Sequence, residues 1–281
     1  MSVFDTSGRL ETVIGRRGAG PGEFLGIRRP LVDAHDSIHV LDVLLGRITV
    51  LTPSLQVARV TPTPNLPALI LHDGTGVVIG QLPLAAATGY PMHVVTPEGR
   101  VIRSFGVDTP DFRQNAPRLT SRVIGPGLGG TVWTAAPGDY VLERWDPATG
   151  SRVERVDVLT SWFEKSDAPR EDERTPPEPV IEGLWQDTLG FVWVLVRDKD
   201  ANWAPPARAN VERSLTASEY GRIYDWVLEV IDVGLQMPVA SRRFDDVLWY
   251  RPPTALVTSP REDDSWYVKF DIWRPELVWK Q

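Results

Sequence analysis

A short hairpin unit that recurs along this 281-residue chain constrains its fold more than any other feature. Each copy has a β-rich run ending in Asp or Thr, a turn of two to four residues, and a second run in which apolar and polar residues alternate. The clear copies are 2–15, 48–60, 93–106 and 142–158, and the weaker copies are 228–244 and 267–280. The turn-opening residues are Asp5, Thr52, Thr96, Asp146, Asp232 and Asp271, at intervals of 47, 44, 50, 86 and 39 residues.

A period near 40–50 residues with β patterning is typical of the blades of a β-propeller. Asp and Thr favour the end of a strand because their side chains can bond the backbone of the following turn, whose dihedral angles Pro and Gly supply. The alternation on both sides of the turn fits strands that are half-buried between neighbouring blades. An ordinary β-sandwich with hairpins is the alternative reading of the same pattern.

Five of the hairpins are preceded by a further pair of strand-like runs, so that each complete unit predicts a four-stranded blade. These pairs are 31–34 with 37–42, 68–72 with 76–82, 121–125 with 130–136, 181–186 with 190–196, and 247–250 with 254–259. The first hairpin has no such pair. We therefore predict an all-β fold, a single propeller domain over 1–281 of the six-bladed type. Two alternatives stay open: an incomplete first blade, or a five-bladed ring that residues 2–15 complete.

Composition narrows the functional classes. The absence of cysteine excludes disulfide scaffolds, cysteine nucleophiles and thiolate zinc sites. A net charge of −7 argues against a nucleic-acid partner, because binding to phosphates calls for positive charge. No apolar run approaches the roughly 20 residues of a membrane span, and residues 1–18 have no apolar signal segment. We expect a soluble monomer. Its compartment stays open, with an exported or periplasmic parent protein as one reading.

The long fourth interval contains two insertions, 160–180 and 199–219, which are charged and Pro-rich and predict loops. Aromatic residues on such loops can anchor a partner protein. Trp162, Phe163 and Trp203 are the candidates, either as a partner-binding surface or folded back onto their own domain.

Residues 15–52 carry a recognisable signature: GRRGAGPGEF from Gly15, then Pro30, LVDAHDSIHVLD, and GRITVLT from Gly46. This stretch resembles an NHL-type repeat of bacterial six-bladed β-propeller proteins. The resemblance implies that the glycine-rich segment crosses from one blade to the next, with positive φ angles at its glycines. It also implies that Asp42 and Arg47 form a polar pair at a strand turn. The sequence departs from the pattern at Gly46, where Asn is common, and in its later blades. The resemblance implies a binding scaffold and little chemistry.

Motifs for catalysis and cofactors are weak. The glycine-rich stretch lacks the Gly-Lys-Ser/Thr ending of a phosphate loop. The four histidines have no metal-binding spacing, and Ser104, Ser121 and Ser161 have no His beside them in sequence. We therefore expect no catalytic residue, no metal and no cofactor.

The best-motivated binding site is the axial channel, where the inner strands of a propeller converge. One ionisable residue from each complete blade is a candidate ligand contact: Asp33, His72, Arg122, Glu182 and Arg251. A solvated ring of compensating charges is the simpler reading. We predict a non-enzymatic β-propeller that binds a protein or a small ligand through its loop face or channel. The alternative is a divalent-cation-dependent hydrolase or lactonase using Asp33 and Glu182, which the lack of an inner-strand Asn weakens.

Overall fold

The computed structural model describes most of the chain as antiparallel β-strands. The described residues are 1–5, 7–33, 35–62, 69–72, 76–80, 90–96, 100–107, 122–165, 175–205, 221–251, 255–258, 261–262, 268–269 and 271–278. They fall into two compact units, Met1–Asn115 (unit 1) and Ala116–Gln281 (unit 2).

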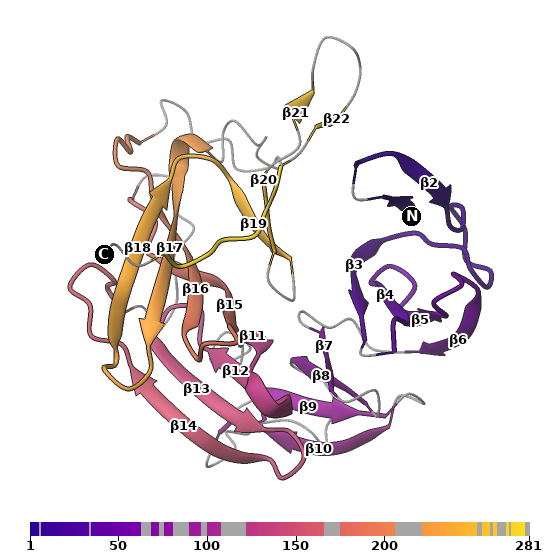
Figure 1. The fold of residues 1–281 in the computed structure, drawn as a ribbon, viewed down its shortest axis with the longest axis horizontal. Coiled ribbons are helices and arrows are strands. Elements are labelled where there is room, and N and C mark those ends of the chain that lie inside the picture. The colour runs from indigo at the N-terminus through magenta and orange to yellow at the C-terminus, as the bar shows by residue number, and fades with distance from the viewer. Residues whose placement is uncertain are drawn as a thin grey trace. The chain divides into compact units, whose positions relative to one another are not determined.

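Unit 1 contains a hairpin and two four-stranded antiparallel sheets, in each of which the strands follow one another in chain order (Figure 1). The hairpin is β1 (Ser2–Phe4) and β2 (Leu10–Val13). The first sheet is β3 (Ile27–Val32), β4 (Ile38–Asp42), β5 (Arg47–Leu51) and β6 (Val57–Pro62). The second sheet is β7 (Leu69–His72), β8 (Gly76–Gly80), β9 (Met92–Val95) and β10 (Val101–Phe105).

Unit 2 repeats the four-stranded pattern twice and adds smaller sheets. One sheet is β11 (Val123–Pro126), β12 (Val132–Ala135), β13 (Val141–Asp146) and β14 (Ser151–Asp157), with the 3-10 turn η1 (Leu128–Gly130) between its first two strands. The next is β15 (Val180–Gln186), β16 (Val192–Lys199), β17 (Tyr224–Asp232) and β18 (Met237–Phe244). A three-stranded sheet joins β19 (Leu248–Arg251), β20 (Ala255–Thr258) and β23 (Ile272–Trp273), and a two-stranded sheet pairs β21 (Arg261–Glu262) with β22 (Val268–Lys269).

Five of the six predicted hairpins and all five predicted inner strand pairs are confirmed. The last hairpin, predicted over 267–280, is wrong. In the described residues β22 pairs with β21, and β23 pairs with β20. The expected turn contains Ile272 and Trp273, which are strong strand formers. Trp273 packs edge-on against Phe244 at a centroid distance of 5.6 Å, so a tertiary contact draws this segment into a sheet.

Burial differs along two of the sheets. In the β3–β6 and β15–β18 sheets the second and third strands are largely buried on both faces, rather than half-buried as the alternation predicts. The fourth strand is mostly exposed and carries charged side chains, for example along β14. Charges on an edge strand discourage pairing with another chain. In the described part of the chain, no helix has the length and apolar character needed to span a membrane.

Candidate functional site

The five residues predicted to line a channel lie in, or directly next to, the first strand of a sheet. His72 ends β7 and Arg251 ends β19, but the side chains of both lie outside the described residues. Asp33 follows β3 and Arg122 precedes β11, so neither is on a strand as predicted. Glu182 alone lies within its strand, β15.

Asp33 organises the turn that it opens. Its carboxylate accepts the backbone N–H groups of His35 and Ser37 at 2.8 and 2.9 Å and pairs with His39 Nε2 at 3.0 Å. Burial opposes ionisation of Asp33, but the hydrogen bonds from His39, Ser37 and His35 outweigh it and lower its pKa. These contacts explain why Asp lies after β3 without any ligand.

Glu182 and Arg122 of unit 2 also interact with neighbouring groups of their own unit. Glu182 accepts a hydrogen bond from Arg197 Nε at 2.8 Å. Burial lowers the pKa of Arg122, against the opposing effect of the Glu143 and Asp139 carboxylates. Ligand binding by the five residues stays a prediction. Among the described residues, no three His, Asp or Glu side chains gather into a group that could hold a metal ion.

The predicted partner-binding aromatics of the first insertion pack onto their own unit. Trp162 and Phe163 are partly buried against the core cluster around Tyr140 and Val227. Trp162 Nε1 donates to Glu229 at 3.0 Å, and Tyr140 donates to the second oxygen of the same buried carboxylate. Burial and Glu229 together raise the pKa of Tyr140. The insertion is therefore fastened to β17 at this point.

Trp203 of the second insertion is partly buried, and its backbone N–H bonds the Asp200 carbonyl at 3.0 Å. Side-chain contacts therefore give Trp162 and Phe163 structural roles, while a partner surface at Trp162, Phe163 and Trp203 stays a prediction.

The glycine-rich segment between β2 and β3 is fixed by the two residues that the repeat resemblance singled out. Asp42 is fully buried and accepts the backbone N–H groups of Leu25, Gly26, Leu44 and Leu45 at 2.7–3.1 Å. Burial alone would raise the pKa of Asp42, but these backbone bonds hold it below its ordinary value. Arg47 donates to the carbonyls of Ala19, Gly20 and Glu23 at 2.7–2.8 Å.

The expected positive φ holds for Gly22 (72°), and not for Gly18 or Gly20. Gly18 instead leaves room for the Glu23 side chain. A Cβ there would lie 2.2 Å from Glu23 Oε2, because the Glu23 carboxylate folds back to accept Gly20 N–H at 2.7 Å and Arg16 Nε at 2.7 Å. The segment is therefore closed by its own acidic residue.

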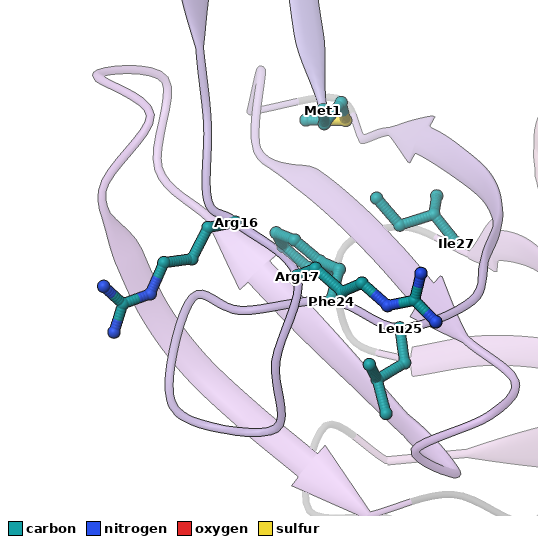
Figure 2. Close-up of a pocket in the computed structure, with 6 residues that line it drawn as sticks. All are labelled: Met1, Arg16, Arg17, Phe24, Leu25 and Ile27. Carbon is teal, nitrogen blue, oxygen red and sulfur yellow. The ribbon is translucent and has the colours of Figure 1, made fainter.

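A pocket of about 400 Å³ opens beside this segment in unit 1 (Figure 2). We call it the Arg17 pocket; its lining residues are Met1, Arg16, Arg17, Phe24, Leu25 and Ile27. Phe24 is buried in a core cluster with Val40 and Leu51, and Met1 and Ile27 pack against that cluster. This pocket was not predicted from the sequence, although the adjacent Arg16 and Arg17 before the glycines are a visible signal.

The two arginines of the pocket differ. Arg16 is bound to Glu23 and points away from the other lining residues, whereas Arg17 extends past Phe24 towards Leu25 and Ile27 (Figure 2). Arg17 is exposed, and its guanidinium has no hydrogen bond or ion pair within the described residues. Within the described residues, the pocket therefore combines an apolar wall with the unpaired guanidinium of Arg17 and with the Met1 ammonium, which donates to the Ile14 carbonyl at 2.7 Å.

One cross-strand pair resembles a nucleophile and its base. His93 lies opposite Ser104 in the β9–β10 register, and its Nδ1 is 2.8 Å from Ser104 Oγ. Sequence spacing alone did not bring these residues together. His93 is completely buried, and burial lowers its pKa to about 4. The imidazole is closed to a substrate, so this pair does not support hydrolase chemistry.

Comparison with known proteins supports the architecture. Residues 1–70 match the model of the DUF5128 family, described as a 6-bladed beta-propeller. The chain has a β-propeller fold. A member of the DUF4221 family from Bacteroides vulgatus superposes with a TM-score of 0.58 at 10% identity, covering 98% of this chain and 86% of that protein. A predicted exported protein from Bacteroides fragilis superposes with a TM-score of 0.55 at 11% identity, covering 93% and 73%. No curated protein matches the sequence. Similarity at this identity concerns the fold alone.

Proposed function

We propose that this β-propeller is a non-enzymatic binding protein that holds a small anionic ligand in the Arg17 pocket. The unpaired guanidinium of Arg17 beside the apolar wall of Phe24, Leu25 and Ile27 is the observation that carries the proposal. A guanidinium recognises a carboxylate through two parallel hydrogen bonds, and a ligand in such a pocket excludes water from them. An apolar group on the same ligand gains from covering the wall.

The loop that bears Arg17 is held in place before any ligand arrives. Phe24 N–H bonds the Arg16 carbonyl at 2.9 Å and Gly18 N–H bonds the Phe24 carbonyl at 3.2 Å, which closes the segment around Arg17. Arg47 and Asp42 fasten its two sides to the β3–β6 sheet. A site held in one geometry loses less conformational entropy on binding. The same contacts support the NHL-like assignment of this blade, which is part of the proposal.

Octanoate is a suitable probe, because it combines one carboxylate with an apolar chain. Isothermal titration of wild-type protein with octanoate is expected to show binding that weakens about 10-fold in Arg17→Gln, the order of effect of one charge-assisted hydrogen-bonded pair. Arg9→Gln is the matched control, since Arg9 is also exposed and lies outside the pocket. Equal octanoate affinity in wild type and Arg17→Gln would contradict the proposal.

A further inference from the structure

Two exposed leucines, which we call the leucine strip, lie at and next to the Arg17 pocket. Leu25 lines the pocket and is 40% exposed, and Leu44 in the β4–β5 turn is 70% exposed. Leu44 lies over Gly26, where an added Cβ would be 2.6 Å from Leu44 Cγ. The backbone N–H groups of Leu25 and Leu44 bond the same Asp42 carboxylate, so the two residues are neighbours on one surface.

Turn chemistry does not account for these side chains. The turn after β4 needs only the backbone N–H groups of Leu44 and Leu45, which Asp42 accepts. A polar side chain at position 44 would leave those bonds intact and would be better hydrated. Neighbouring apolar side chains exposed at the side of a pocket are a feature of a ligand-covered surface.

The charge of the pocket limits the ligand further. Arg16 is already paired with Glu23, and the Glu23 pKa is lowered by hydrogen bonds from Gly20 and Arg16, so this carboxylate stays ionised. Of the two arginines, only Arg17 has no ion pair within the described residues, and the Met1 ammonium, which also lines the pocket, already donates to the Ile14 carbonyl at 2.7 Å. A second carboxylate at the far end of an extended ligand would lie over the apolar side chains of Leu25 and Leu44 without a partner, so the site fits a monocarboxylate better than a dicarboxylate.

We infer that the ligand is a monocarboxylate with an extended aliphatic tail, its carboxylate on Arg17 and its tail across Leu25 and Leu44. The inference rests on the proposed function and specifies the ligand class of the same pocket. Contact with the exposed leucine strip makes affinity depend on chain length beyond the part of the ligand that fills the pocket. Each further methylene group that covers Leu44 is expected to strengthen binding about fourfold at full burial.

Titration of a series of straight-chain acids from butanoate to decanoate tests the inference. In wild type the affinity is expected to rise with each methylene and then level off. In Leu44→Ser the short acids keep their affinity and the rise stops earlier. Octanedioate is expected to bind at least about 10-fold more weakly than octanoate, because its second carboxylate lies on the strip. Leu189→Ser is the matched control, since Leu189 is 71% exposed and belongs to unit 2.

The outcomes separate the two proposals. Identical chain-length profiles in wild type and Leu44→Ser, with binding still weakened by Arg17→Gln, would overturn the tail position and leave the anion pocket intact. Octanedioate binding as tightly as octanoate would overturn the monocarboxylate class alone. Absence of binding across the whole series, or binding that Arg17→Gln never changes, would overturn both the inference and the proposed function.

Discussion

The two units of this chain fix their repeats by different means. In unit 1 the glycine-rich segment is held by buried polar groups, with Asp42 accepting four backbone N–H groups and Arg47 donating to three carbonyls. In unit 2 the corresponding sheets are held by aromatic packing. All 11 tryptophans of the sequence follow residue 130, and Trp133, Trp145, Trp185 and Trp226 are among its largest fully buried side chains.

This difference bears on where binding can occur. A tightly packed aromatic interior leaves little surface open, whereas backbone amides gathered on a carboxylate hold a loop rigidly while its other side chains stay exposed. The Arg17 pocket lies in the polar-fastened unit. The proposed binding site and the aromatic core therefore lie in different regions of the chain.

The largest expected effect is on the aromatic core of unit 2. Trp185 is 2% exposed and stacks on both Trp193 and Tyr250, at centroid distances of 5.8 and 5.1 Å with ring planes within 10°. Trp185→Ala is expected to lower the free energy of unfolding by about 4 kcal/mol, through lost burial and the cavity left behind. Chemical denaturation, monitored by tryptophan fluorescence, measures this change in the free energy of unfolding, since every tryptophan lies in unit 2.

The control for this change is Trp203→Ala. Trp203 is only partly buried and belongs to no described ring contact. Removal of its ring is expected to lower the free energy of unfolding far less. Unfolding midpoints that fall equally in the two variants would contradict the view that aromatic packing stabilises unit 2.

The second prediction concerns acid stability. His93 has a folded-state pKa of about 4, against about 6.5 in an unfolded chain. Between these values the unfolded chain binds the extra proton, so the free energy of unfolding decreases as pH falls. The contribution of neutral His93 is complete above pH 6.5, and about 3 kcal/mol is lost by pH 4. Thermal unfolding at pH 7, 6, 5 and 4 measures this slope.

His93→Gln cannot titrate, so it is expected to flatten the slope between pH 6.5 and 4 even though it lowers stability at pH 7. His35→Gln keeps the wild-type slope, because His35 is exposed. A wild-type stability that stays constant from pH 6.5 to 4 would show that His93 is not buried in the folded protein.

Most of the sheet pattern was predictable from local signals, and most of the site was not. Hairpins such as β13–β14 join residues that are close in sequence. The turn-forming residues Asp146 and Gly150 allow this hairpin to be predicted from the sequence. Strand β23 pairs instead with β20 because of the Trp273 contact with Phe244, which no local pattern contains. The Arg17 pocket depends likewise on the backbone bridge between Arg17 and Phe24.

Asp42 shows the boundary between what sequence can and cannot reveal. The resemblance to a repeat predicted a polar pair of Asp42 and Arg47 at a strand turn, and both residues are polar anchors there. They do not bond each other through their side chains in the contacts described, and instead fasten the two sides of the segment at 18–26. The residue types at 42 and 47 indicate that polar anchors are needed there. Which backbone groups they bond depends on how residues 19–26 fold back onto the β4–β5 turn, and the sequence pattern does not contain that information.

The smallest expected effect tests the polar anchoring of unit 1. Asp42→Ala leaves four backbone N–H groups without their acceptor, and some of these regain water as the segment opens, so the free energy of unfolding is expected to fall by about 2 kcal/mol. The amides of Leu25, Gly26, Leu44 and Leu45 should exchange faster with deuterium, and octanoate should bind more weakly because Arg17 and its wall lose their relative position. Asp232→Ala, which removes the acceptor of one exposed amide, is the control. It should neither speed exchange of those four amides nor weaken octanoate binding. If Asp42→Ala accelerates amide exchange at 25–26 while octanoate affinity is unchanged, the anchored segment supports the fold alone and the link between polar fastening and binding is wrong.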